Sequence, residues 1–403
     1  MSWPTSAEEI WRYSRIDDFD LDRYRPAGAD IGDPPRTTGG GPMAAEAGAR
    51  SGLVVVRNGR VVHCELDPAV AALGVVVAGI AECDDPELAE YFGNCSDAST
   101  DPFVALHDAF VESGAFIRVP SGVVVEHPIV VLHWSEGDKL ATFPHTLLVA
   151  GSMSEVTVVD RCSSIGSDQL VDAVVELSIG DGANVSYLSV QEHGPGTTHV
   201  ALQRAHISRD ATLRSSAVAL GGDYARLRCE SRLDGSGAES DLLAVYYGDG
   251  TQMLDFRTLQ DHVAPNTTSN LLFKGAVEDS AQSVYSGMVH LRPAAQRSRA
   301  YQTNRNLVLT EGASAESIPN LKIEANDVKC SHASTVGPID DDQLYYLESR
   351  GIPPAEAERL IVLGFFDDVF NQLPVPALVA PLRRTVIEKI EHRGAPIGHG
   401  ARK

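Results

Sequence analysis

The feature that most constrains this chain is a run of more than two hundred residues, from about Ala115 to Gly337, built of short strand-like segments. The segments are rich in valine, isoleucine and other residues that favour strands. Short turns separate them, and several turns place an acidic residue or glycine, then a small residue, before an alanine or threonine. Those alanines and threonines are Ala183, Ala211, Ala238, Thr251, Ala281 and Ala313.

The turns recur at a rough period. The gaps are 28 residues from Ala183 to Ala211, 27 to Ala238, 13 to Thr251 and 30 to Ala281. These gaps lie near one or two multiples of about 14 residues, which is the mark of a repeat architecture. The period predicts a mainly β fold in which a β-solenoid stacks one turn on the next, with unpaired strand edges only at its two ends. An antiparallel sandwich or barrel is the alternative that the imperfect spacing leaves open.

Residues 1–115 are predicted to form a mixed N-terminal region. The segment "SAEEIWRYSRI" has helical spacing, with Ile10 and Tyr13 on one side. A mobile loop is expected at about 27–50, where glycine, proline and small residues dominate. Asn58-Gly59 predicts a hairpin turn, because that pair favours the primed two-residue turns. Two helices are expected at "DDPELAEYFGN" and "DPFVALHDAFVESG", since each begins with an aspartate that can cap a helix and a proline at its first position.

Residues 338–403 are predicted to form a helical C-terminal domain after a β core over 116–337. "DDDQLYYLESRG" has a natural helix stop at Gly351. The next helix starts after a proline pair, and its apolar residues from Leu360 to Phe370 cover nearly the whole circumference. Such a helix needs burial on more than one side, either inside a helical subdomain or with one face docked on a partner. A basic helix with a frayed end follows, from Arg383 onward.

Composition excludes several classes of function. The formal charge of −22 argues against a nucleic-acid binder, which would show basic stripes. No phosphate-binding loop occurs, so we expect no nucleotide hydrolysis by the chain itself, and no dinucleotide fingerprint, zinc-protease motif or nucleophile elbow occurs either. The N-terminus resembles no signal peptide and no apolar run is long enough to span a bilayer, so a cytoplasmic protein with reduced cysteines, not bound to membranes, is expected.

The candidate chemistry lies in "ANDVKCSHASTVG". Cys330 and His332 are two positions apart, so on a strand both side chains point to the same face. Imidazole and thiolate together suit iron or zinc. The residues alone also allow a buried structural cysteine beside a surface histidine. The other histidines, His133, His193 and His199 among them, show no ligand spacing, and hydrogen-bonded or exposed roles are expected for them.

Around these residues the sequence resembles a known family. The array "NDVKCSHASTVGPIDDDQLYYLESRGIPPAEAERLIVLGFFDDVF" is similar to the signature region of the SufB/SufD family of iron–sulfur cluster assembly scaffolds. "DPFVALHDAFVESGAFIRVPSGVVVEHPIVVLHW" resembles the entry into that family's core, and the resemblance covers at least residues 101–371 in the same order. The K-C-S-H form and the length of 403 residues resemble the SufD branch. Ala333-Ser334 departs from the expected Gly-Ala, a change between small residues.

The resemblance implies a right-handed parallel β-helix between helical terminal parts. It implies a scaffold protein and no enzyme. It implies pairing with a SufB-type paralogue, docking of a SufC-type ABC ATPase on the C-terminal helices, and sulfur supplied indirectly by a cysteine desulfurase. Cys330 and His332 would hold a transient iron or iron–sulfur cluster that the partner completes, with His332 the stronger ligand. Leu363, Phe366 and Phe370 would help to dock the ATPase. The resemblance also admits a reduced flavin at the level of the complex, and a homodimer when the chain is alone.

Two alternatives differ in class. One is a β-helix enzyme acting on polysaccharide, which would need clustered carboxylates, or calcium and a basic residue, along a groove and would normally be secreted. The other is a purely structural homo-oligomeric scaffold that handles no iron. Loss of function on changing His332, with folding intact, would argue against the structural alternative.

Overall fold

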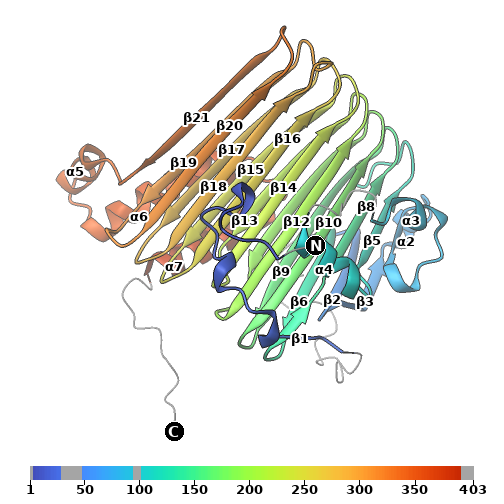
Figure 1. The fold of residues 1–403 in the computed structure, drawn as a ribbon, viewed down its shortest axis with the longest axis horizontal. Helices are drawn as coiled ribbons and strands as arrows, with labels where there is room; N and C mark the ends of the chain where they lie inside the picture. The colour runs from blue at the N-terminus through green and yellow to red at the C-terminus, as the bar shows by residue number, and fades with distance from the viewer. Residues whose placement is uncertain (1–2, 29–47, 94–100, 392–403) are drawn as a thin grey trace.

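The computed structural model describes residues 3–28, 48–93 and 101–391. Between residues 115 and 337 the chain winds back and forth between two facing sheets, so that each turn lays one strand on each sheet (Figure 1). The predicted β-solenoid is therefore confirmed, and the sandwich or barrel alternative is wrong. Most of the predicted mobile loop, Cys95 and the frayed end after the last helix lie outside the described residues.

The first sheet has its strands in the order β20-β18-β16-β14-β12-β10-β8-β5-β4, with β7 and β1 at its side. Every pair among the strands from β5 to β20 is parallel, and only the terminal pair β4–β5 is antiparallel. The bounds are β20 Ser314–Ile323, β18 Gln282–Leu291, β16 Met253–His262, β14 Tyr224–Leu233, β12 Thr197–Ile207, β10 Gln169–Ile179, β8 His145–Ala150, β5 Ala115–Val119, β4 Val76–Gly79, β7 Leu140–Thr142 and β1 Arg25–Pro26.

The second sheet runs in the order β21-β19-β17-β15-β13-β11-β9-β6-β2-β3 and is also parallel up to a terminal antiparallel pair, β2–β3. The predicted hairpin turn joins that pair, with positive φ at Asn58 and Gly59. The bounds are β21 Lys329–Gly337, β19 Arg299–Val308, β17 Thr268–Val277, β15 Glu239–Gly248, β13 Thr212–Ala219, β11 Asn184–Glu192, β9 Glu155–Ile165, β6 Ile129–Glu136, β2 Gly52–Arg57 and β3 Arg60–Leu66.

The turn motif explains why the strands stack in register. Ala183, Ala211 and Ala238 are fully buried at the corners. The residue before each has positive φ, at Gly182, Asp210 and Gly237, a conformation that glycine and aspartate tolerate best. At each of these corners, an alanine methyl group points into the bore, the interior of the solenoid between the two sheets, and the residue before the alanine has a left-handed backbone conformation.

The N-terminal segment crosses the outer face of the first sheet as three short 3₁₀ turns, Glu9–Trp11, Ile16–Asp18 and Leu21–Arg23 (Figure 1). The helix expected over "SAEEIWRYSRI" is therefore wrong. Tyr13 has a φ of 63°, which interrupts a helix, and the buried side chains are Trp11 and Ile16, not Ile10 and Tyr13. The segment follows the sheet surface, where Arg226 donates to the Ile10 carbonyl at 2.8 Å and Arg257 to the Arg12 carbonyl at 2.7 Å.

Helices occupy both ends of the described chain. Near the N-terminus lie α2 (Pro68–Ala71), a 3₁₀ turn (Ile80–Glu82), α3 (Pro86–Tyr91) and α4 (Pro102–Phe110). As predicted, Asp85 and Asp101 cap α3 and α4 with prolines at the first position. The C-terminal helices are α5 (Asp341–Ser349), α6 (Pro354–Phe370) and α7 (Pro376–Glu391). The last begins earlier than expected, with Pro381 inside it. No helix among the described residues is long and apolar enough to cross a bilayer.

Candidate functional site

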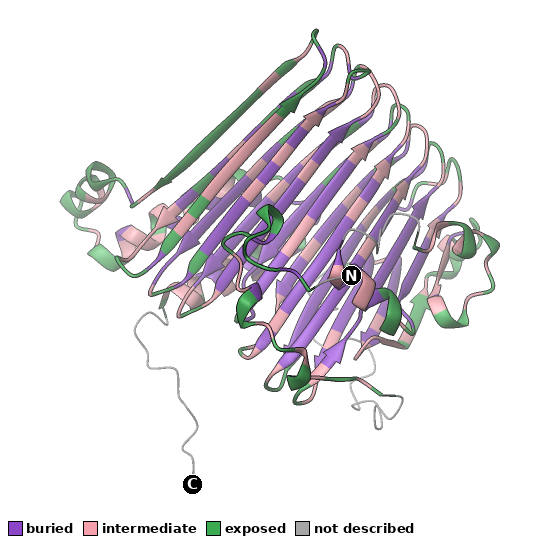
Figure 2. Ribbon diagram, viewed as in Figure 1, coloured by how far each residue is buried: buried purple, intermediate pink, exposed green. Residues whose placement is uncertain are grey.

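The candidate site lies at one end of the solenoid, on the edge strand β21. Cys330 is in register with Ala300 of β19, and His332 is in register with Gln302. Cys330 packs with the inward-facing residues Ala300 and Leu321, so the inner face of β21 also carries His332. Figure 2 shows β21 as an almost continuous exposed strand beside the buried body of the solenoid.

The geometry brings a thiol and an imidazole to the same face of an open edge. Cys330 is partly buried, and desolvation raises the pKa of its thiol. A thiol in that state becomes a good metal ligand only when a cation or metal approaches it. His332 is exposed. Within the described part of the chain, no group of three or more His, Cys, Asp or Glu side chains is arranged to hold a metal ion. The two residues therefore form at most a partial site in this chain.

Behind His332 lies a polar patch that sequence reasoning missed. Gln302, one strand inward, is buried beside the Tyr285 hydroxyl, which is 3.1 Å from Thr258 Oγ1. Further along the inner face of β19, Asn304 and Asn306 bond the Tyr246 hydroxyl at 3.0 and 2.6 Å. The available signal was the alternation Gln302, Asn304, Asn306, which puts three amides on one face of a strand.

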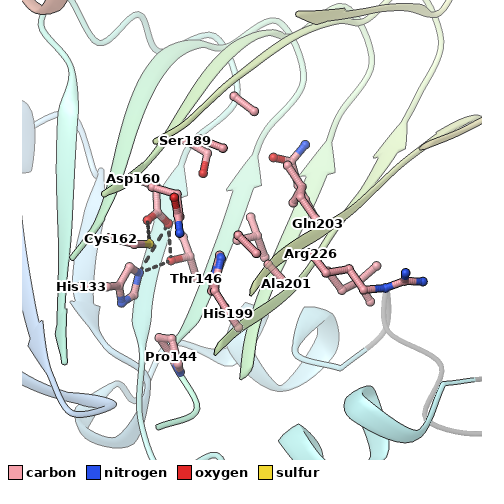
Figure 3. Close-up of a pocket in the computed structure, with 18 of the residues that line it drawn as sticks. His133, Pro144, Thr146, Asp160, Cys162, Ser189, His199, Ala201, Gln203 and Arg226 are labelled. Carbon is pink, nitrogen blue, oxygen red and sulfur yellow. Dashed lines mark hydrogen bonds and ion pairs between the residues drawn. The ribbon is translucent and has the colours of Figure 1, made fainter. Parts of the chain in front are cut away.

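A second polar cluster lies in the bore between the two sheets, toward the other end. Asp160 accepts hydrogen bonds from Thr146 Oγ1 at 2.9 Å and from the Tyr187 hydroxyl at 2.6 Å, and His133 Nε2 lies 3.4 Å from it. Figure 3 shows His133, Thr146 and Asp160 joined in this way, with Cys162 and His199 beside them. The strand alternation His133, Ser135 and Asp160, Cys162 was the signal for this cluster.

The residues predicted to help dock an ATPase are buried or partly buried in this chain. Phe366 and Phe370 have no exposed surface, because they pack α6 onto the outer face of the second sheet against Val245 and Tyr247. Leu363 is partly buried in the same cluster. These residues hold the helix on the solenoid. The exposed apolar side chains of this region are instead Tyr345, Tyr346 and Leu360.

Comparison with known proteins decides the family. The family model described as the SUF system FeS cluster assembly SufBD core domain matches residues 133–365, which is more than half of the chain, and the model of the SufBD protein N-terminal region matches residues 49–131. This chain belongs to the SufBD family. The core match begins in β6, includes the whole of β21 with Cys330 and His332, and ends inside α6.

Relatives agree with this assignment. An iron–sulfur cluster assembly SufBD family protein of Mycobacterium tuberculosis is 34% identical over 316 residues, which is 76% of this chain and 77% of the relative. The iron–sulfur cluster assembly protein SufD of Bacillus subtilis is 32% identical over 346 residues, covering 84% and 79%. A SufBD family protein of Synechocystis is 28% identical over 311 residues, covering 74% and 68%. This SufBD chain is thus a component of the SUF system of iron–sulfur cluster assembly.

Buried histidines make the stability of this SufBD protein depend on pH. Burial lowers the pKa of His107 to about 3 and those of His199 and His262 to about 4, from an ordinary value of 6.5. Below pH 6.5 the unfolded chain therefore binds protons that the folded chain does not, and stability is lost as the pH falls toward 4. Asp172 and Asp108, whose pKa values burial raises, oppose this loss.

The expected slope is about 1.4 kcal/mol per pH unit for each such histidine. Urea unfolding at about pH 7.5 and about pH 5 measures it. His262 is bonded to Thr267 Oγ1 at 2.7 Å and to Ser269 Oγ at 2.8 Å, so His262→Gln keeps polar contacts and should flatten the dependence by one group. A midpoint that rises on acidification would contradict the assignment of these histidines as neutral.

Proposed function

We propose that this chain is a SufD-type subunit that pairs along the open edge of its solenoid with a SufB-type paralogue and shares with it the site where a nascent iron–sulfur cluster is built. The observation that carries the proposal is the edge strand β21, which presents Cys330 and His332 on one face and whose outer edge pairs with no strand in the described part of the chain. An unpaired parallel strand is a ready template for one more strand.

A partial site suits an iron–sulfur cluster that is built transiently and then transferred to another protein. A closed shell of four cysteines would retain its cluster, whereas one imidazole and one thiol hold iron only when the partner adds the remaining ligands. His332 is the ligand with the better access, because it is exposed while Cys330 is partly buried. Reduction of sulfur to sulfide needs electrons, and a reduced flavin carried by the complex is the donor that fits this role.

ATP hydrolysis would come from an ABC ATPase docked on the C-terminal helices. The exposed tyrosines of α5, Tyr345 and Tyr346, and Leu360 of α6 offer the apolar surface for this contact, at 73%, 57% and 43% exposed. Closure of two such ATPases would move α6, and with it β15 and β17 beneath it, which lie in the same sheet as β21. The cysteine desulfurase would act indirectly, as the source of sulfur. Family membership leaves no support for the polysaccharide-acting alternative.

The test is an anaerobic co-expression of this chain with its SufB-type and ATPase partners, followed by assays of iron and acid-labile sulfide per complex. His332→Ala should leave the complex assembled and remove most of its iron and sulfide. The matched control is His127→Ala, since His127 is also exposed but lies just before β6, far from β21. Equal iron and sulfide in wild type and His332→Ala would mean that the chain only frames its partner's site. Failure of the chain to bind any SufB-type partner, with self-association through β21, would favour the homo-oligomeric scaffold.

A further inference from the structure

The bore of the solenoid contains a small chamber that is separate from the edge site, which is the pair Cys330 and His332 on β21. A cavity of about 40 Å³ lies between β6 and β9 on one sheet and β8, β10 and β12 on the other. Its polar lining includes His133, Thr146, Asp160, Cys162 and His199 (Figure 3). Small side chains on neighbouring strands leave the space open, namely Ala173, Ala201, Ala217, Ala219 and Ala225.

His133 and His199, which line this chamber, and His193 beside His199 have ring nitrogens without a hydrogen-bond partner among the described residues. His133 uses Nε2 toward Thr146 and Asp160, but its Nδ1 is buried with no hydrogen bond from any described residue. The same holds for Nε2 of His199 and for both ring nitrogens of His193, whose ring centroid lies 4.7 Å from that of His199. The three histidines are 6%, 7% and 4% exposed, so bulk water does not reach them freely. Unpaired buried groups of this kind are costly, and native proteins satisfy nearly all of them.

The side chains that line the chamber are better suited to bind water than a metal ion. A neutral imidazole has one N–H donor and one acceptor nitrogen, so a group of them needs a ligand that both donates and accepts. Burial lowers the pKa of His199 to about 4, which keeps its ring neutral. Burial also raises the pKa of the Cys162 thiol, and the oxygens of Asp160 are already engaged. The described residues hold no arrangement of three metal-binding side chains.

The chamber is closed in the direction of β21. Four aromatic side chains fill the bore between it and the edge site, in the order Tyr246, Phe256, Phe273 and Tyr285, with successive ring centroids 4.4, 5.8 and 5.5 Å apart. All four are at most 2% exposed, and Phe256 itself lines the chamber. These four aromatic rings separate the polar chamber from Gln302 and His332.

We propose that the chamber is a permanent hydration site, in which ordered water bridges His133 to His199 and is separated from the cluster-building edge. The cavity has room for on the order of one to three water molecules, and each would find the two to four polar partners that buried water needs. The polar residues of the bore are then a structural core held by water, and ligands reach His332 from the edge and not through the bore. This inference does not depend on the proposed function.

Two measurements on the full chain test it. A high-resolution crystal structure should show ordered solvent within hydrogen-bonding distance of His133 Nδ1 and His199 Nε2. His199→Leu removes a water partner and should lower the folding equilibrium constant about tenfold or more, measured by urea unfolding. His199→Gln, which keeps a donor and an acceptor, should recover most of that loss. His127→Leu, at an exposed position, is the matched control and should leave the midpoint unchanged.

Three results would overturn the proposal. An empty chamber together with a stabilised His199→Leu would show that the imidazoles are simply unpaired. Stoichiometric zinc or iron in the isolated chain, lost in His199→Leu, would show a metal site instead. If His199→Leu does not fold, the crystallographic solvent density and the His199→Gln variant still test the proposal. A His199→Gln variant that is as unstable as His199→Leu, together with a chamber without water, would contradict a water bridge.

Discussion

Replacing Asp255 by alanine will lower the free energy of unfolding by about 3–5 kcal/mol, because it leaves buried positive charges without their partner. Asp255 has no exposed surface and accepts hydrogen bonds from Arg226 at 2.5 Å, from Arg257 at 2.6 Å and from the Tyr224 hydroxyl at 3.1 Å. Both arginines also hold the N-terminal segment through the carbonyls of Ile10 and Arg12. Urea unfolding measures the loss, and limited proteolysis should show earlier cleavage of the N-terminal segment.

The control for this experiment is Asp181→Ala. Asp181 pairs with Arg209 at 3.0 Å, but the two side chains are 47% and 65% exposed, so the expected change is only about 0–1 kcal/mol. The double change of Asp255→Leu with Arg226→Met should be less harmful than Asp255→Ala, because it removes one charge together with its partner. A loss below about 1 kcal/mol for Asp255→Ala would mean that the N-terminal segment leaves the sheet readily and lets water reach both arginines.

Phe366→Ala is expected to cost about 3–5 kcal/mol, as is typical of a large aromatic side chain removed from a packed core. Phe366 is fully buried between α6 and the second sheet and lies 6.2 Å from Phe370, ring centroid to ring centroid. The same cluster includes residues of α7, so the change should loosen both helices. Chemical unfolding of the isolated chain measures the cost, with no ATPase present.

Tyr345→Ala separates packing from docking. Tyr345 is 73% exposed on α5, so its loss should change stability by less than about 0.5 kcal/mol. If the ATPase docks on this surface, Tyr345→Ala will weaken its binding while the isolated chain stays as stable as wild type. An unchanged stability for Phe366→Ala would contradict the packing of α6 described here.

The solenoid could be predicted because its corners repeat. Ala183, Ala211 and Ala238 each follow a residue suited to positive φ, and that local requirement recurs in the sequence as it does in space. Successive partners Asn184, Thr212 and Glu239 stand in register, 28 and 27 residues apart, which matches the spacing of the alanines. The hairpin at Asn58-Gly59 and the aspartate caps were predictable for the same reason, since each depends on neighbours in sequence.

Features that depend on distant contacts could not be predicted. The apolar residues of α6 cover most of the helix, so nothing local says that Phe366 faces the sheet and Leu360 faces solvent. Trp11 and Ile16 are buried because the first sheet and Phe103 of α4, both distant in sequence, pack against them. For the site, alternation placed Cys330 and His332 on one face of a strand. It could not show that this strand is the last one of its sheet, or that His133 and His199 line the same cavity between the two sheets.

The two ends of the solenoid differ in the direction and length of their edge strands. At the N-terminal end, the edge strand of the second sheet is β3, which runs antiparallel to β2 and carries Arg60, His63 and Glu65. The edge strand of the first sheet is β4, which has only 4 residues and runs antiparallel to β5. At the other end, β20 and β21 are 10 and 9 residues long and entirely parallel to their neighbours. A solenoid that can pair its edge strands at one end only forms a dimer, whereas a solenoid that can pair at both ends would grow into a fibre. Under the pairing proposed above, the reversed strands β3 and β4 would leave one solenoid end for a companion and so keep the assembly finite.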